Sequence, residues 1–263
     1  MDCVIESAVS GGTRGYFLPV AKSEKMMRDG FAQLKAGAGG TDRLDHTYAT
    51  LRSVNGFYRT RYSLARLREM AQIVFDSVSS HGWWHIDPPD LLHCAKTEAE
   101  PVASFISKTL REISGSGLHH PYSLLTKWMH FCFPESFVIY DWRVASSVQT
   151  WSYFAFPLEE DGYAEFAAAR IAQPDGTGYR GLVSFYRLCW QAASSDQQEA
   201  LQTAAQQLSN AIDSHVSVID VIDKALWIAN GDPRKMGLLT HGNPPSSKTA
   251  CVTAAAVPGG RLS

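Results

Sequence analysis

Two apolar segments joined by a short loop, within residues 121–148, constrain the fold of this chain more than any other stretch. In the first segment, apolar residues recur at the three-and-four spacing of one helix face. We therefore expect a core helix from Pro121 to Cys132, with the proline in its first turn and Pro134 ending it. A second helix is expected from about Trp142 to Trp151. The stretch predicts two packed helices that meet at one short connection.

That connection ends at Asp141, which follows an apolar run from Phe137 to Ile139 and takes the N-cap position of the second helix. Asp is among the commonest N-cap residues, so a cap alone explains it. A catalytic role is compatible with the cap, because the positive end of the helix dipole favours an ionised carboxylate. Tyr140, Trp142 and Arg143 add two aromatic rings and a cation, more than a cap requires. Asp141 is therefore the predicted catalytic residue.

The sequence FVIYDWRV, preceded by an apolar helix and a Pro-containing turn, resembles the segment that carries the essential Asp of the helix-hairpin-helix DNA glycosylases. The resemblance covers residues 121–148 and implies an all-α, two-lobed fold with Asp141 as the catalytic acid. Gly115-Ser116-Gly117 lies near the position of the family's hairpin, with Leu118-His119-His120-Pro121 inserted before the helix. The resemblance thus implies an altered hairpin.

The resemblance also bears on the mechanism, through the lysine that forms a Schiff base in the strand-cleaving members of the family. An ungapped comparison places that lysine near Ser123, and Lys127 lies about one helical turn later. This departure implies a monofunctional enzyme that uses water.

Composition and spacing set the class of protein. The chain has 263 residues, 45% of them hydrophobic, and no apolar run long enough to span a membrane. The N-terminus lacks a signal-peptide pattern, which favours a cytoplasmic location. The five cysteines are scattered without metal-ligand spacing, and the glycine and tryptophans between His81 and His85 argue against a helical metal pair. We expect no metal and no cofactor.

The remaining periodicity predicts further helices and no sheet. We expect one catalytic domain over residues 1–232, as a single body or as two interleaved lobes with the site between them. Residues 233–263, rich in Gly, Pro, Ser, Thr and Ala, are expected to form a flexible tail. The other expected helices cover residues 22–37, a segment from Asp42 that Asn55-Gly56 breaks, and residues 62–78, 102–113, 163–172, 182–189, 201–212 and 218–226.

Charge is unevenly distributed along the chain, although its net value is only −2. Residues 1–70 hold eleven Lys and Arg against seven acids, whereas residues 151–230 hold four against ten. This asymmetry permits a local phosphate-binding face on a nearly neutral protein. Arg59 and Arg61 belong to the densest basic cluster, which could equally be a solvated helix face.

The predicted chemistry is hydrolysis of an N-glycosidic bond in double-stranded DNA that contains modified bases, by a monomeric enzyme. A carboxylate stabilises the oxocarbenium-like sugar or activates water, and the base must first be flipped into a pocket. Aromatic rings would sandwich that base and histidines would contact its edge. The predicted base pocket consists of Trp83, Trp84, His85, His119, Tyr140 and Trp142. The predicted contacts to the DNA backbone are Ser123, Lys127, Arg143, Arg59 and Arg61.

The Trp-rich loop SHGWWHIDPPD favours a wide pocket for a sugar-decorated base, because carbohydrates stack on Trp. Bacterial phage-defence glycosylases that attack glucosylated hydroxymethylcytosine look similar, so that base is one expected substrate. Repair of alkylated or oxidised purines is the alternative. Two other classes of protein stay open. One is an all-helical interaction protein, in which Asp141 is only a cap. The other is a nuclease, although the sequence shows no clear cluster of metal-binding carboxylates to favour it.

Overall fold

The computed structural model describes residues 11–37, 41–115, 121–155, 158 and 160–229, and in these ranges the chain is helical without a β-strand. This confirms the predicted all-α class. The elements are α2 (Gly11–Ala36), α3 (Thr41–Tyr58), α4 (Leu64–Ser80), α5 (Lys96–Gly115), α6 (Tyr122–Cys132), α7 (Trp142–Ala155), the 3₁₀ helix η1 (Glu160–Phe166), α8 (Ala168–Ile171), α9 (Tyr179–Ala192), α10 (Ser195–Ile212) and α11 (Val218–Ala229).

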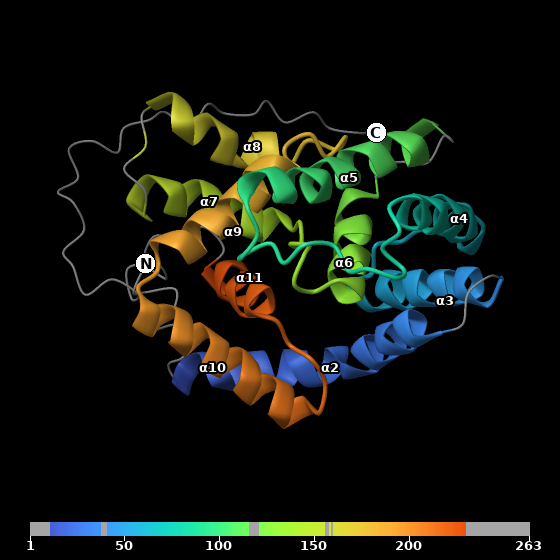
Figure 1. The fold of residues 1–263 in the computed structure, drawn as a ribbon, viewed down its shortest axis with the longest axis horizontal. Coiled ribbons are helices and arrows are strands. Elements are labelled where there is room, and N and C mark those ends of the chain that lie inside the picture. Colours follow the sequence, from blue (N-terminus) through green and yellow to red (C-terminus); the bar gives the residue numbers. More distant parts are fainter. Residues whose placement is uncertain (1–10, 38–40, 116–120, 156–157, 159, 230–263) are drawn as a thin grey trace, which may run out of the picture.

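Helix α6 lies inside the molecule and packs against α2, α3 and α5 (Figure 1). Apart from Ser123, all of its side chains are buried, which agrees with the core helix predicted there. Helices α2 and α10 lie side by side along one edge, and α11 packs between α10 and α7 (Figure 1). Helices α2 and α11, the first and last helices of the described residues, are therefore brought to the same region.

Aromatic rings form much of the core around α6. Trp83 packs edge-on or tilted against Phe105, Phe133 and Phe137, with ring centroids 4.8–6.2 Å apart. Trp128 is fully buried, and its indole N–H donates to Thr50 Oγ1 at 2.9 Å. Large rings bury much apolar area, and their mutual geometry adds stability beyond that area. This core fixes the position of α6 and of the loop that follows it.

The predicted break at Asn55-Gly56 is wrong, because α3 continues to Tyr58. The Asn55 side chain holds the next loop instead of ending the helix. Its amide oxygen accepts from Thr60 Oγ1 at 2.7 Å and from the Tyr62 N–H at 2.9 Å, and its amide nitrogen donates to the Tyr62 carbonyl.

The single helix predicted over residues 163–172 is divided into η1 and α8. The division falls at Ala167, where the side-chain oxygen of Gln149, on α7, accepts from the Ala168 N–H at 3.0 Å. A cap supplied by another helix thus starts α8, and no local pattern in the sequence could indicate it. The predicted tail, residues 233–263, lies outside the described residues.

Candidate active site

Asp141 lies at the start of α7, at the end of a buried extended run that is fastened on two sides. The Tyr179 hydroxyl, from α9, donates to the Val138 carbonyl and accepts from the Val138 N–H, both at 2.9 Å. The Tyr140 N–H donates to Thr126 Oγ1, on α6, at 3.0 Å. The position of Asp141 is therefore set by α6 and α9 as well as by α7.

The two oxygens of Asp141 have different surroundings. Oδ1 accepts from the Arg143 N–H at 2.9 Å, so the predicted helix cap is present. Oδ2 lies 3.7 Å from the Lys127 Nζ, and 30% of the side chain is exposed. The cap uses one oxygen and leaves the other directed at a lysine. A cap and a chemical role for this carboxylate are thus compatible.

Lys127 projects from the buried helix α6, and only 8% of its side chain is exposed. Its ammonium group donates to Ser123 Oγ at 2.6 Å and lies 4.9 Å from the centre of the Tyr58 ring. Burial lowers the pKa of the Lys127 amine, against the opposing charges of Asp141 and Asp223. A lysine with a lowered pKa beside a carboxylate is a chemically distinctive pair.

A cavity of about 460 Å³ opens beside this pair. Five helices contribute to its wall, and Phe57, which is 42% exposed, lies on its rim. The Arg143 guanidinium lies 4.4 Å from the centre of the Trp227 ring and forms another part of the wall. The lining residues are Val20, Ser23, Glu24, Phe57, Tyr58, Lys127, Ile139, Asp141, Arg143, Asp223, Lys224 and Trp227.

Below the cavity, α2 and α11 are joined by buried ion pairs. Arg28 donates to both oxygens of Asp220, at 2.6 and 3.2 Å, and to Glu24 at 3.1 Å. Glu24 also lies 3.2 Å from Lys224 and accepts from the Tyr58 hydroxyl at 2.7 Å. Removing one partner of such a network leaves an uncompensated buried charge, which is strongly destabilising.

His130 extends this network into α6. Its Nδ1 lies 2.7 Å from the Phe137 carbonyl, and its Nε2 lies 2.9 Å from Asp220. Both partners are acceptors, so the ring is best satisfied when both nitrogens carry a proton. Burial is the largest single influence and lowers the pKa of His130, but the charge of Asp220 together with the hydrogen bonds to Asp220 and to the Phe137 carbonyl outweighs it, so the pKa is raised.

Asp223 brings a second carboxyl group to the cavity wall. It is buried, and its Oδ1 accepts from the Tyr186 hydroxyl at 3.2 Å. Burial, helped by the charges of Asp220 and Asp141, raises the pKa of Asp223 to about 6, against the opposing charges of Lys224 and His130. The cavity therefore holds two carboxyl groups in unlike surroundings.

The loop after α3 carries two arginines next to the cavity rim. Arg59 and Arg61 are exposed and have φ values of +53° and +66°, the left-handed conformation that side chains rarely adopt. The Asn55 hydrogen bonds to Thr60 and Tyr62 hold the loop in this shape. Strained residues that the surroundings maintain are often found at functional sites.

The predicted tryptophan pair does not line the cavity. Trp83 is only 8% exposed and belongs to the aromatic core, whereas Trp84 packs against Trp128 and donates its indole N–H to Ser79 at 3.0 Å. His85 is exposed and also lies outside the cavity lining. Both tryptophans reach the core because residues 81–86 form turns, which free them from the alternation of a regular element.

Other predicted residues lie at or near Asp141. Tyr140 stacks on Tyr122 with ring centroids 4.1 Å apart, and Trp142 is 59% exposed; neither lines the cavity. Ser123 does not line it either, but it binds Lys127. Lys127 and Arg143 do line it, and the burial of Lys127 argues against the predicted contact to a DNA phosphate. His119 and the other residues of 116–120, where the resemblance implies an altered hairpin, lie outside the described residues.

Sequence reasoning missed the contributions of α2 and α11, which lie far from Asp141 in the chain. Glu24, Asp223, Lys224 and Trp227 complete the cavity. The segment VIDVIDKALWIA offered one clue, since it is strongly apolar yet contains two acids, and buried acids need partners.

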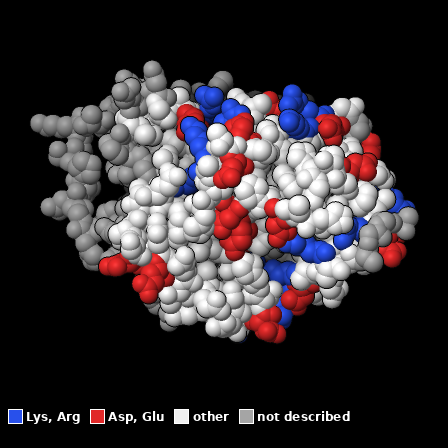
Figure 2. Space-filling model, in the orientation of Figure 1, with Lys and Arg blue, Asp and Glu red and all other residues white. Residues whose placement is uncertain are grey.

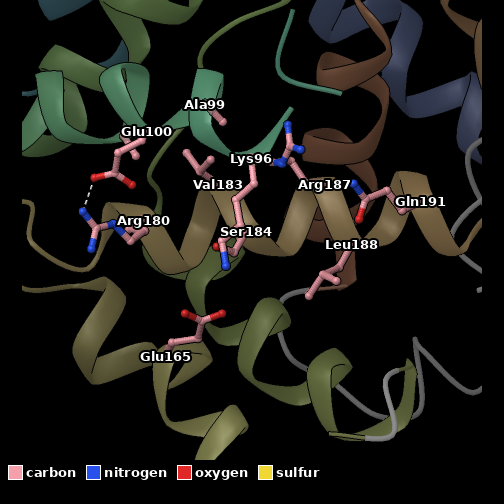
Figure 3. A pocket seen from close by; sticks show the side chains of 11 residues that line it. Lys96, Ala99, Glu100, Glu165, Arg180, Val183, Ser184, Arg187, Leu188 and Gln191 are labelled. Carbon is pink, nitrogen blue, oxygen red and sulfur yellow. Dashed lines mark hydrogen bonds and ion pairs between the residues drawn. The ribbon is translucent and has the colours of Figure 1, made fainter. Parts of the chain in front are cut away.

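A second, smaller cavity of about 160 Å³ lies between α5 and α9 (Figure 3). Its charged groups hold elements together: Arg180 pairs with Glu100, and Arg187 donates to the Leu91 and Cys94 carbonyls at 2.7 and 2.8 Å. This arrangement favours a structural role for the second cavity.

Acidic and basic side chains are interspersed across the face shown in Figure 2. Within the described ranges, no group of three His, Cys, Asp or Glu side chains is placed to hold a metal ion, and no helix is long and apolar enough to cross a membrane. Comparison of the chain with protein-family models, curated proteins and solved structures found no match.

Proposed function

We propose that this protein is a DNA N-glycosylase that hydrolyses the bond between a modified base and its deoxyribose, with Asp141 as the catalytic carboxylate. The observation that carries the proposal is the pairing of Asp141 with the buried Lys127 at a cavity of about 460 Å³. That volume lies within the range of small-molecule sites, about 300–1,000 Å³, and can hold a flipped nucleoside. The sequence resemblance of residues 121–148 to the helix-hairpin-helix glycosylases supports the same chemistry and a two-lobed arrangement.

In the proposed reaction, the bond from the sugar C1′ to the base nitrogen breaks and its electron pair leaves with the base. The Asp141 carboxylate stabilises the oxocarbenium-like sugar, a water molecule adds to C1′ and gives up a proton, and the departing base gains a proton. The helix N-terminus that Asp141 caps places the positive end of the helix dipole beside the carboxylate. Water as the nucleophile makes the enzyme monofunctional, so the DNA strand stays intact.

The DNA partner is supported by the cations around the cavity. Arg59 and Arg61 lie on the loop after α3, next to Phe57 and Tyr58, and Arg143 lines the wall of the cavity. We propose that these three arginines hold phosphates on either side of the flipped nucleotide of double-stranded DNA, with one protein molecule per site. Phe57, Tyr58 and Trp227 take over the ring contacts first expected from the Trp83-Trp84 loop.

Glucosylated hydroxymethylcytosine in phage DNA is the substrate we favour, and an alkylated or oxidised purine is the alternative. Polar groups that line the cavity, Ser23, Glu24 and Lys224, can contact sugar hydroxyls. The two candidate substrates are distinguished by challenging cells that make the protein with phages whose DNA carries glucosylated or unmodified cytosine. Equal growth of both phages on cells that make the protein, with excision of alkylated purines in vitro, would leave ordinary base repair.

The test of the chemistry uses a panel of duplexes that each carry one modified base, followed by mild alkali and a gel. We expect alkali-labile abasic sites without added metal. Asp141→Asn keeps a cap that accepts from the Arg143 N–H but removes the negative charge, so we expect a loss of at least about 100-fold in single-turnover rate with folding retained. Cleavage of the duplex only when a divalent ion is added would indicate a nuclease instead.

The matched control is Asp175→Asn, because Asp175 also accepts from a backbone N–H two residues later, at 3.0 Å, but lies outside the cavity lining. We expect this variant to retain full activity. Near-normal excision by Asp141→Asn would overturn the catalytic assignment.

One observation favours a second form of the activity. The Lys127 amine has a pKa lowered by burial and lies 3.7 Å from Asp141, so in its neutral form it could attack C1′ in place of water. Loss of the base would then leave a covalent Schiff base between the lysine and the opened sugar, and strand cleavage would follow.

We propose the water mechanism and expect borohydride to trap no covalent protein–DNA adduct. The reaction is run with the duplex that the panel identifies, and the protein is resolved on a denaturing gel. A trapped adduct that disappears in Lys127→Ala and persists in Lys35→Ala, a substitution of a lysine outside the cavity lining, would establish the lysine mechanism instead.

A further inference from the structure

We propose that Asp223 is a second catalytic residue, the acid that protonates the base as it leaves, while Asp141 stabilises the sugar. The inference rests on the proposed glycosylase function and adds a residue from α11 to it. Its starting point is that both carboxyl groups line the same cavity, although they are 82 positions apart in the chain (223 − 141).

The surroundings of Asp223 suit an acid. The side chain is buried, and the Tyr186 hydroxyl donates to Oδ1 at 3.2 Å from behind the cavity, since Tyr186 does not line it. With Oδ1 accepting this bond, a proton on the carboxyl group resides on Oδ2. Burial holds the pKa of Tyr186 well above its ordinary value, so the phenol keeps its proton and can donate it to Oδ1.

Charges on the neighbouring elements set the protonation of Asp223, and burial is the largest influence. Cations of α6 and α11 favour the ionised form, whereas carboxylates of α7 and α11 favour the protonated form. The ionisable groups around Asp223 are Lys224 and Asp220 on α11, His130 and Lys127 on α6, Asp141 on α7, Tyr58 on α3 and Tyr186 on α9, with Glu24 and Arg28 of α2 bound to Lys224 and Asp220.

Two carboxyl groups with different environments are the usual means of dividing acid and base roles in glycoside cleavage. Here Asp141 is partly exposed and accepts from a backbone N–H, whereas Asp223 is buried and accepts from a phenol. The proton on Asp223 Oδ2 moves to the departing base as the C1′–N bond breaks. Water adds to C1′ and releases a proton, and the Asp223 carboxylate regains a proton from solvent.

The test measures single-turnover excision between pH 5 and 9 on a duplex with glucosylated hydroxymethylcytosine or, if that is not cut, on the panel duplex that is. The protonated acid is the active form, so the wild-type rate should fall about tenfold per pH unit above about pH 6. Asp223→Asn keeps the volume and the bond from Tyr186 but has no acidic proton. We expect a loss of about 100-fold at pH 6 and no such pH dependence.

Asp213→Asn, which changes an exposed carboxyl at the end of α10, is the control and should behave as wild type. A 7-methylguanine duplex, where it is a substrate, separates catalysis from positioning: this base is already cationic and leaves without protonation, so Asp223→Asn should retain its rate. Equal losses on both duplexes, or a wild-type pH profile in Asp223→Asn, would overturn the proposal while leaving Asp141 in place.

A second measurement needs no turnover. Carbon-13 labelling of the aspartates allows the Asp223 carboxyl to be assigned by its absence in Asp223→Asn, and its titration followed by NMR. We expect a midpoint near pH 6. A midpoint below about pH 5 would overturn the role of Asp223 as the acid. Absence of excision from every duplex in the panel would instead overturn the proposed glycosylase function itself.

Discussion

At the scale of single residues, His130 shows how burial and charge decide a protonation state. Its two ring nitrogens face the Phe137 carbonyl and Asp220, and its pKa is raised. A group whose pKa is higher in the folded state stabilises the fold fully below its unfolded value, about 6.5, and loses that contribution as the pH rises through the folded value. The His130 contribution should therefore be largest in mild acid.

We predict that His130→Gln lowers the free energy of unfolding by about 2–4 kcal/mol at pH 6, and by less at pH 9. The imidazolium that pairs with Asp220 is present in the wild type at the lower pH and is lost as the pH rises. Urea unfolding at both pH values gives the two differences. His215→Gln, on an exposed ring, is the control. A difference that grows with pH would contradict a charged His130.

Residues also show where sequence reasoning reached its limit. The sequence singles out Asp141 as a candidate because a helix cap and its neighbours are adjacent in the chain, and its catalytic role stays a prediction. Asp223 was missed because burial, Tyr186 and the charge of Asp141 define its chemistry, and these come from other helices. Trp83 is predicted to line the base pocket but lies in the core, because the adjacent pair Trp83-Trp84 does not indicate which ring is buried there.

At the scale of elements, periodicity predicted most helices, since apolar faces at three-and-four spacing are local in the sequence. The structure confirms helices around residues 62–78, 102–113 and 121–132, with shifted ends. The errors lie where a distant group decides, as with Gln149 at the start of α8. The close approach of two helices is equally hard to predict from sequence, because it depends on the backbone of a second helix that is distant in the chain.

Gly178 and Gly181 mark a close approach of this kind, where α9 meets η1 and α8. A Cβ at Gly178 would lie 2.0 Å from the Arg170 carbonyl oxygen, and one at Gly181 would lie 2.2 Å from that of Glu165. We predict that Gly181→Ala destabilises the protein by about 1–3 kcal/mol, because the helices must separate. In Gly30→Ala, a Cβ meets no neighbour within 4 Å, so the higher helix propensity of alanine should raise the free energy of unfolding by no more than about 1 kcal/mol. Thermal unfolding of both variants compares them, and equal melting temperatures would exclude the close approach.

At the scale of the whole molecule, the net charge of −2 does not reveal the local cations that the proposed DNA binding requires. We predict that replacing Arg59 and Arg61 together by alanine reduces the salt dependence of binding to a duplex with a tetrahydrofuran abasic analogue. Each phosphate contact contributes about 0.9 to the slope of log K against log salt, so the slope should fall by about 2. Fluorescence anisotropy over a range of salt concentrations measures it.

Lys108→Ala with Arg111→Ala is the matched double variant, since it removes two exposed cations from α5, which adds nothing to the cavity wall. Its slope should equal that of the wild type. An unchanged slope in the Arg59 and Arg61 variant would place the bound duplex on another face.

The joining of α2 to α11 has a consequence for protein synthesis. Chains emerge from the ribosome N-terminus first, and α11 is the last of the described helices to appear. Until then Arg28 and His130 lack Asp220, Glu24 lacks Lys224, and the cavity lacks Asp223 and Trp227. A nascent chain therefore presents Asp141 without a finished pocket around it. Under the proposed function, base excision could begin only after translation has passed α11.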